Sequence, residues 1–214
     1  MDALLERTRE ALVKNRMNCI VVKTKEEAKE KVFSIIEKGA TVACGGSVTL
    51  NECGVIEALR SGEYKFLDRF KEGLSGEELT KIYREAFFAD YFLTSTNAIT
   101  EKGELYNVDG RGNRVAAMIY GPDKVIVVAG KNKIVPDLRA ADIRVKAHAA
   151  PKNTQRLGCE TYCNKKGACL ALGKGGIGAG CDSDGRICCD YVVMAHQREK
   201  GRITVILVDE ALGY

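Results

Sequence analysis

A regular alternation of short apolar runs with segments of helical periodicity constrains the fold most strongly. The run KVIVVAG, residues 124–130, carries no charge after its first residue, which is typical of a strand buried on both faces of a parallel sheet. Further apolar runs occur at 18–23, 41–44 and 89–95, with amphipathic segments between them. This alternation predicts an α/β domain with helices on both faces of a mainly parallel sheet.

Capping and turn residues locate the element boundaries. Thr24 with Glu27, and Ser75 with Glu78, have the spacing of a capping box at a helix start. The sequence 101–103, Glu-Lys-Gly, predicts the turn of a hairpin. A second hairpin is expected from 191–197 and 202–209, joined across 199–201. The segments predicted to be helical are 2–16, 24–39, 48–59, 75–89, 112–121 and 136–150.

Length and charge limit the class of protein. A chain of 214 residues can bury a self-sufficient core, and we expect a single domain over residues 1–214. The net charge of +4 is spread among acidic residues, and the chain has no tryptophan, so we expect no nucleic-acid partner. The charged N-terminus is unlike a signal peptide, and no apolar run approaches the roughly 20 residues of a membrane span. We therefore expect a cytoplasmic protein with no membrane partner.

Cysteines are concentrated in one short stretch. Six of the nine lie between residues 159 and 189, and a reducing compartment favours metal binding or redox chemistry over disulfides there. Four have the spacing Cys163-x5-Cys169-x11-Cys181-x6-Cys188, with glycines between them that let the chain fold back on itself. These four are the predicted metal ligands, and Cys159 and Cys189 are alternatives for any of them.

Two metal centres are compatible with these thiolates. The spacing differs from zinc ribbons with paired C-x-x-C knuckles and from bacterial ferredoxins, while ligand softness allows both zinc and iron–sulfur. Lysines and glycines at 164–167 and 173–176 offer positive charge and backbone N–H groups, which offset the negative charge of a thiolate-bound cluster. An iron–sulfur cluster of the 4Fe-4S type is therefore favoured, with zinc as the alternative, and free thiols on a flexible loop remain a third interpretation.

A glycine-rich turn follows the apolar run 41–44. Gly45, Gly46 and Ser47 lie where a strand ends and a helix begins, so backbone N–H groups can approach a phosphate or carboxylate there. The equally good alternative is a tight turn in which Ser47 caps the helix, because GGS alone is a weak phosphate-loop match.

Polar residues also crowd the end of the apolar run 89–95, where open α/β sheets bind ligands. We predict that they line a pocket for a small anionic molecule, a carboxylate or a phosphate. An arginine there has the geometry to form a bidentate pair with a carboxylate. The alternative is that the Asn and Asp residues serve turns. The residues are Asn97, Asn107, Asp109, Asn113 and Arg114.

The stretch ADYFLTSTNAITEKGELYNVDGRGNRVAAMIYGPDKVIVVAG, with GGSVTLNECGVIEAL before it, resembles the LUD-domain family, named for bacterial lactate-utilisation protein C. CDSDGRICCDYVVM, with the final GRITVILVDEALGY, resembles a cysteine-bearing branch of that family, so the likeness covers nearly the whole chain. It implies a three-layer α/β/α sandwich of the NagB/RpiA/CoA-transferase type with a small antiparallel extension. The cysteine segment, 159–189, is then an insertion near the C-terminus.

The resemblance also implies a function. The family's role is in the oxidation of L-lactate to pyruvate, together with iron–sulfur partner proteins, so an electron-transfer subunit for lactate or a related 2-hydroxy acid is expected. A more distant similarity is to methylthioribose-1-phosphate isomerases, but Asn97 stands where they have a catalytic aspartate, and an amide cannot supply that acid–base function. The alternatives are a sugar-phosphate or CoA-type enzyme with structural zinc, and a non-catalytic redox-sensing module.

Overall fold

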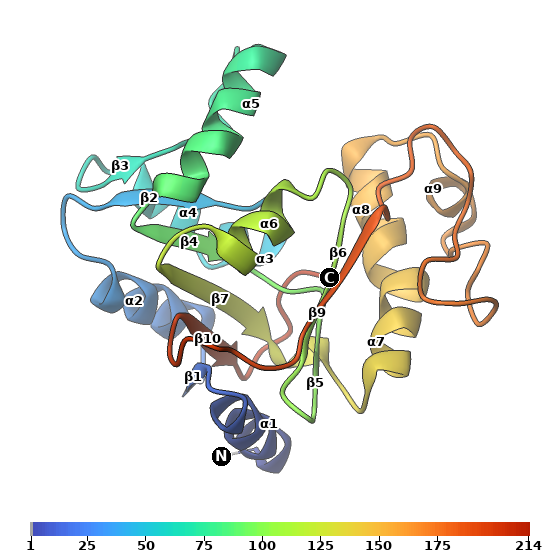
Figure 1. Ribbon diagram of the computed structural model, residues 1–214, viewed down its shortest axis with the longest axis horizontal. Helices are drawn as coiled ribbons and strands as arrows, with labels where there is room; N and C mark the ends of the chain where they lie inside the picture. The colour runs from blue at the N-terminus through green and yellow to red at the C-terminus, as the bar shows by residue number, and fades with distance from the viewer. Residues whose placement is uncertain (1) are drawn as a thin grey trace.

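The computed structural model describes residues 2–214 and contains two β-sheets (Figure 1). The larger sheet has the strand order β1-β10-β7-β4-β2-β3, and every neighbouring pair is parallel. This confirms the predicted mainly parallel sheet. Its strands are β1 (Asn18–Val22), β2 (Thr41–Cys44), β3 (Lys65–Phe66), β4 (Tyr91–Thr94), β7 (Lys124–Gly130) and β10 (Ile203–Val208).

Helices cover both faces of this sheet, and the alternation of side chains along β7 explains why. Val125 and Val127 belong to one apolar core, whereas Ile126 and Val128 belong to the other, because successive strand residues point to opposite faces. The predicted α/β/α layering is therefore confirmed. The first core is covered by α1 (Ala3–Lys14) and α6 (Asn113–Tyr120), and the second by α2 (Lys25–Ile35), α3 (Val48–Glu52) and α4 (Val55–Leu59).

The smaller sheet has the order β8-β5-β6-β9. Strands β5 and β6 are antiparallel across the predicted turn at 101–103, which confirms that hairpin. Gly103 is required there, because its φ is +77° and a Cβ would lie 2.5 Å from the backbone carbonyl carbon of Ala11. The strands are β5 (Ala98–Thr100), β6 (Leu105–Asp109), β8 (Ile134–Val135) and β9 (Asp190–Met194).

The second predicted hairpin is wrong. Strand β9 pairs with β6 in the small sheet, whereas β10 lies between β1 and β7 in the large one. The physical reason is burial: β10 is apolar and almost wholly buried, which suits a central parallel position, while β9 is partly exposed and forms an edge.

Two predicted helices also differ from the structure. The segment 48–59 is divided at Gly54, whose φ is +67°. The helix predicted to end at residue 150 continues to Leu157, because a π-helical turn precedes Pro151 and places that proline in a first helical turn, where no N–H is needed. This helical arm comprises α7 (Leu138–Arg144), the turn η3 (Val145–Ala149) and α8 (Ala150–Leu157).

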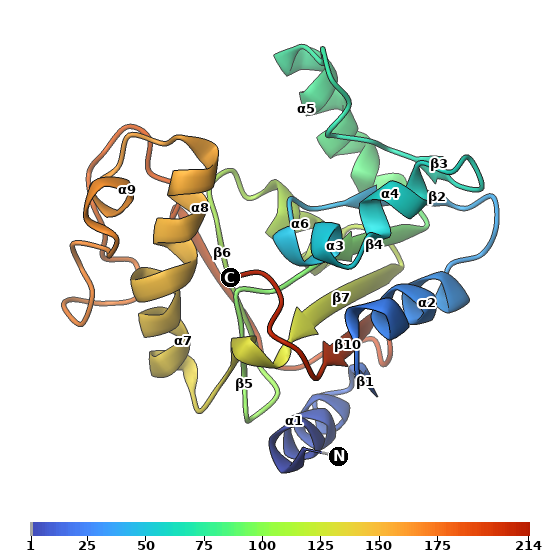
Figure 2. The same cartoon turned by 180° about the vertical axis from the view of Figure 1, so that it is seen from behind.

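The arm covers the small sheet, and the cysteine segment lies beyond it. Ala98 and Tyr106 of the small sheet pack against Ala141, Val145 and Ala150 of the arm. Figure 2 shows the arm, the short helix α9 (Tyr162–Lys166) and the loops around it on one side of the molecule, with α5 (Gly76–Glu85) projecting from the other part. Within residues 2–214, no helix is both long enough and apolar enough to cross a bilayer.

Candidate functional site

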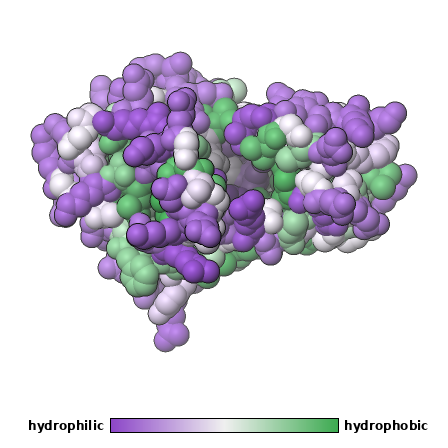
Figure 3. Space-filling view, turned by 90° about the horizontal axis from the view of Figure 1, so that it is seen from above, coloured by the Kyte–Doolittle hydropathy of each residue, from purple (hydrophilic) through white to green (hydrophobic). Residues whose placement is uncertain are grey.

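A cavity of about 480 Å³ lies at the carboxyl ends of the parallel strands, between the large sheet and the helical arm. Strands β2, β4 and β7 all end at this edge, and the segments that follow them supply Gly46, Ser95 and Lys133 to the cavity wall. The arm supplies the opposite wall, including Val145 and Asn153. Seen from above, the molecule is hollowed between these two parts (Figure 3). This is the position at which open α/β sheets bind ligands.

Most of the predicted ligand-binding residues meet at this cavity. Two of the eight lie behind its wall instead: Gly45 packs against the side chain of Arg114, and Asn107 is fully buried. Ligand contact remains a prediction for all eight. Those that line the cavity are Gly46, Ser47, Asn97, Asp109, Asn113 and Arg114.

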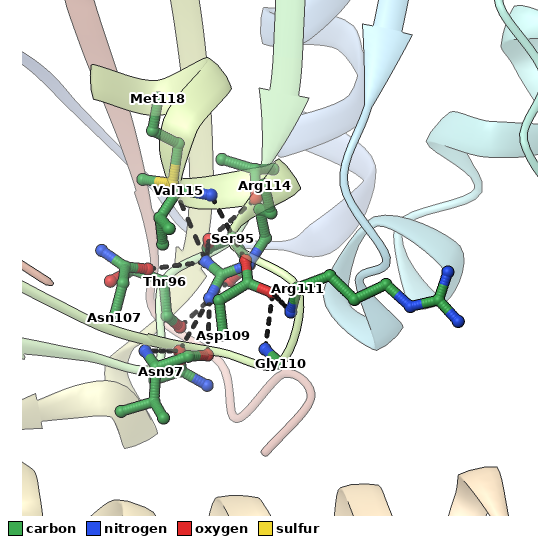
Figure 4. Close-up of polar contacts among 12 residues, drawn as sticks. Ser95, Thr96, Asn97, Asn107, Asp109, Gly110, Arg111, Arg114, Val115 and Met118 are labelled. Carbon is green, nitrogen blue, oxygen red and sulfur yellow. Dashed lines mark hydrogen bonds and ion pairs between the residues drawn. The ribbon is translucent and has the colours of Figure 1, made fainter. Parts of the chain in front are cut away.

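Arg114 is the centre of a buried polar network (Figure 4). Its Nη1 donates to Oδ1 of Asn107 at 2.7 Å and to a backbone carbonyl, and its Nη2 donates to Oδ1 of Asn97 at 3.1 Å and to another carbonyl. Its Nε lies 3.4 Å from Oδ2 of Asp109. Burial lowers the pKa of Arg114, and the Asp109 carboxylate opposes that effect. All three nitrogens have protein partners, so this guanidinium organises the cavity wall instead of offering a free fork.

Asp109 serves turn chemistry as well as the ion pair. Its Oδ1 accepts the backbone N–H of Gly110 at 2.8 Å, and its Oδ2 accepts that of Val115 at 3.2 Å. The Oδ2 bond satisfies an N–H group in the first turn of α6, whose preceding residue, Gly112, has a φ of +71°. Arg111, in contrast, extends away from the network (Figure 4).

The glycine-rich turn behaves as a helix start. Ser47 Oγ accepts the backbone N–H of Leu50 at 3.2 Å, so the serine caps α3. Gly46 borders the cavity, and a Cβ on it would still lie 3.9 Å from the Arg69 guanidinium. None of these contacts tests whether the turn binds an anion, so anion binding there stays a prediction.

Lys133 is a site residue that sequence reasoning missed. It is 3 % exposed, and its Nζ donates to Oγ1 of Thr49 at 3.0 Å and to Oγ of Ser95 at 2.9 Å. Burial, with smaller effects from the positive charges of Arg144 and Arg114, lowers the pKa of Lys133 to about 7. In the sequence it is one of 33 basic residues, and only its position just after an apolar strand hinted at a site.

Arg69 was also missed. Its guanidinium lies over the Tyr83 ring, 4.7 Å from the centroid, and Nη2 donates to the Tyr83 hydroxyl at 2.8 Å. Its Nε is buried and has no hydrogen-bond partner among residues 2–214. Arg69 borders the cavity, and its contacts with Tyr83 hold the guanidinium in place there. No motif surrounds it in the sequence.

The cysteine segment forms a wall of the same cavity. Cys159 and Cys188 line it, so the two predicted sites are adjacent. Burial and the nearby thiols of Cys163 and Cys169, with a smaller effect of Cys181, raise the pKa of Cys188 to about 12. Cys188 is therefore within electrostatic reach of the other three predicted metal ligands.

Proximity alone does not make these thiols ligands of a metal ion. Within residues 2–214, no group of three or more His, Cys, Asp or Glu side chains is arranged to hold a metal ion. All nine cysteines are free thiols, and soft thiolates are the right donors for zinc or an iron–sulfur cluster. The donor chemistry fits either centre but the arrangement does not, so the loops would have to draw the thiols together.

Two basic side chains anchor these loops. The Arg186 guanidinium donates to the backbone carbonyls of Cys188 at 2.8 Å, Cys181 at 3.1 Å and Gly178 at 2.7 Å. Lys146 Nζ, which is paired with an arm carboxylate, donates to a loop carbonyl at 3.1 Å. These two side chains hold the segment through its backbone carbonyls, and none of their hydrogen bonds reaches a sulfur atom.

A parallel sheet covered on both faces, with a polar cavity where its strands end, defines an α/β protein of the open-sheet class. The chain belongs to the LUD-domain family, because the family model described as LUD domain matches residues 5–208. The expected family is thus confirmed, while its cysteine-bearing branch stays a prediction. The search of curated proteins found no match.

One solved structure supports the same fold, and a second is reported beside it. The crystal structure of a DUF162 family protein from Deinococcus radiodurans is similar, at 14% identity and a TM-score of 0.53, over 96% of this chain and 95% of that chain. Ribose 5-phosphate isomerase A from Methanocaldococcus jannaschii matches at 14% identity and a TM-score of 0.37, over 82% of this chain and 80% of that chain. This second similarity is too low to carry an argument, and the first shows the fold alone.

Proposed function

We propose that this LUD-domain protein binds a small carboxylate in the strand-end cavity and takes part in the oxidation of lactate or a related 2-hydroxy acid. Membership of the LUD-domain family supports a role related to lactate utilisation. The observation that carries the binding proposal is the Arg69 guanidinium, which borders the cavity without a carboxylate partner among residues 2–214. The reaction itself is an inference from the family.

Charge balance favours an anionic ligand. Among the described residues, neither Arg69 nor Lys133 forms an ion pair with a carboxylate. The one acidic side chain that lines the cavity is Asp109, and it is already paired with Arg114. A cation removed from water without a counter-ion is costly, so a ligand carboxylate lowers the free energy of this site.

Arg69 is the group expected to meet that carboxylate. Tyr83 fixes the plane of its guanidinium by stacking and by a hydrogen bond, and a guanidinium of fixed orientation loses little entropy on binding. The cavity of about 480 Å³ also exceeds the volume of a three-carbon acid, so longer 2-hydroxy acids belong in any ligand series.

Calorimetric titration tests the proposal. L-Lactate, pyruvate, longer 2-hydroxy acids and ribose 5-phosphate are titrated into the wild-type protein and into Arg69→Met. We expect saturable binding of a carboxylate that weakens about tenfold or more in the variant, because a charge-assisted hydrogen bond is lost. The control is Arg84→Met, on the projecting helix α5 and away from the cavity wall. Absence of carboxylate binding, or tighter binding of ribose 5-phosphate, contradicts the proposal and favours the sugar-phosphate alternative.

A metal centre on the cysteine segment is a second proposal. The supporting observation is that the charges of Cys163, Cys169 and Cys181 all act on Cys188, which lines the ligand cavity. An iron–sulfur cluster held by these four thiolates would supply one-electron redox chemistry beside the cavity. Zinc on the same thiolates would be structural, because zinc does not change its oxidation state and cannot carry electrons.

Anaerobic reconstitution with iron and sulfide distinguishes these possibilities. We expect broad visible absorbance and bound iron in the wild-type protein, and loss of both in Cys163→Ser. Cys19→Ser is the matched control, since Cys19 lies on β1 and outside the segment. A colourless protein that takes up about one zinc ion per chain contradicts the cluster. A protein that takes up neither metal contradicts the centre altogether.

A further inference from the structure

Lys133 places a primary amine at the wall of the cavity. Its Nζ donates to the hydroxyls of Thr49 and Ser95, at 3.0 and 2.9 Å. These hydroxyls are acceptors for the amine, because each directs its own hydrogen to a backbone carbonyl, of Leu212 and Thr96 respectively. Two of the amine's bonding positions are thereby occupied by N–H donation. The third position of the tetrahedral nitrogen remains for a ligand in the cavity.

The surroundings keep this amine uncharged in a large fraction of molecules. The positive charges of Arg144 and Arg114 lower its pKa further, and the largest opposing effect, that of Glu52, is smaller than either of them. Burial is the largest cause of a pKa of about 7. About half of such amines are neutral at neutral pH, against fewer than about one in a thousand for a lysine with its ordinary pKa. A neutral amine held in position has a lone pair available for attack.

We propose that Lys133 is a nucleophile that forms a reversible imine with the carbonyl carbon of a small 2-oxo acid. The proposal rests on the function proposed above, because a 2-oxo acid is the product of oxidising a 2-hydroxy acid. It adds a covalent contact and a reactive residue to that function. The ligand class is defined by two groups: a carboxylate for the cationic wall and a carbonyl carbon for the amine.

The step balances without an oxidant or a reductant. The nitrogen lone pair forms a bond to the carbonyl carbon as the C=O π bond breaks, and a proton moves from nitrogen to oxygen to give a carbinolamine. Loss of water then gives the C=N bond, and water addition reverses the sequence. The Ser95 hydroxyl, 2.9 Å from Nζ, is positioned to pass the proton between nitrogen and oxygen.

Trapping with pyruvate and sodium cyanoborohydride tests the proposal, because this reagent reduces an imine to a stable secondary amine. Intact mass and peptide mapping of the wild-type protein are expected to locate one adduct at Lys133, formed at least about tenfold faster than adducts at exposed lysines. Lys133→Met is expected to lose this fast adduct. Lys131→Met is the matched control: Lys131 is exposed, lies two residues away and pairs with Asp209, so its loss leaves trapping unchanged.

A second variant retains the amine but alters its setting. Ser95→Ala removes one acceptor and the proposed proton relay, and we expect slower trapping at Lys133 with unchanged thermal unfolding cooperativity. Equal labelling of Lys133 and of exposed lysines in the wild type overturns the proposal, as does persistence of the fast adduct in Lys133→Met. If pyruvate binds in calorimetry but no adduct forms, the imine alone is contradicted. If neither pyruvate nor lactate binds, the proposed function fails as well.

Discussion

Asn97 and Arg114 are joined by a hydrogen bond of 3.1 Å, from Nη2 of the arginine to the side-chain oxygen of the asparagine. The same oxygen accepts the backbone N–H of Val108 at 2.9 Å. One amide therefore ties the segment after β4 to the end of β6 and to α6. Because Arg114 is largely buried, the pair fixes the wall of the cavity on which the functional proposals depend.

This relationship predicts different results for two substitutions at the same position. Asn97→Asp keeps an acceptor and places a negative charge beside Arg114, so we expect stability within about 0.5 kcal/mol of the wild type. Asn97→Ala leaves a buried donor of Arg114 and the N–H of Val108 without a partner, and we expect a loss of about 2 kcal/mol. Urea unfolding measures both. Equal stability of the two variants would show that the amide oxygen is unimportant.

Adjacent glycines should respond differently to alanine. A Cβ on Gly45 would lie 2.9 Å from Cγ and Cδ of Arg114 and 3.1 Å from Oγ1 of Thr94, whereas one on Gly46 would meet nothing closer than 3.9 Å. We expect Gly45→Ala to destabilise the protein by about 1–3 kcal/mol through overpacking, and Gly46→Ala to be nearly neutral. Thermal unfolding of both variants provides the comparison, and a greater loss for Gly46→Ala would contradict this account of the turn.

The buried amine of Lys133 should make stability depend on pH in a defined direction. Its pKa falls from 10.5 to about 7 on folding, so the unfolded chain binds more protons between these values. The wild-type protein therefore gains stability as pH rises from about 7 towards about 10, and the penalty is fully present below about 7. Lys133→Met lacks this contribution. The free energy of unfolding of the variant minus that of the wild type should therefore be larger at about pH 7 than at about pH 9.5.

Urea unfolding at the two pH values measures that difference. All other ionisable groups are common to both proteins. Subtracting the free energy of unfolding of the wild type from that of the variant therefore isolates the contribution of Lys133. A difference that does not change with pH would mean that the amine is solvated or paired in the folded state.

Arg186 should govern the order of the cysteine loop. Its guanidinium donates to three backbone carbonyls, and none of these hydrogen bonds reaches a sulfur atom. We expect Arg186→Met to increase proteolytic cleavage within residues 178–188 several-fold, because the loop gains conformational freedom. Lys174→Met, in the same segment, serves as the control. Unchanged cleavage would show that other contacts order the loop.

The fold was largely predictable from local patterns. The apolar runs and capping residues indicated the parallel strands and most helix starts, since side-chain periodicity and capping are local properties. Ser75 and Glu78 form the predicted capping box. The error at β9 and β10 arose because two strands joined by a short turn were assumed to pair, while burial placed them in different sheets.

The candidate site was predictable only in part. The sequence placed polar residues at the strand ends, and six of the eight predicted residues do line one cavity. The sequence did not indicate that the guanidinium of Arg114 donates its hydrogen bonds to groups within the protein. Its partners belong to segments that come together only on folding. Nor did it identify Arg69 or Lys133, whose properties are set by burial and neighbouring charge.

By itself, the sequence determined the family, the α/β layering and the concentration of thiols between residues 159 and 189. Only the tertiary structure decided that the cysteine segment and the strand ends border one cavity, and that a buried lysine amine lies in its wall. The physical reason is the distance along the chain over which each effect acts. Periodicity and capping act over a few residues, whereas burial, proximity of charges and the sharing of hydrogen-bond donors depend on the distances set when distant segments pack together.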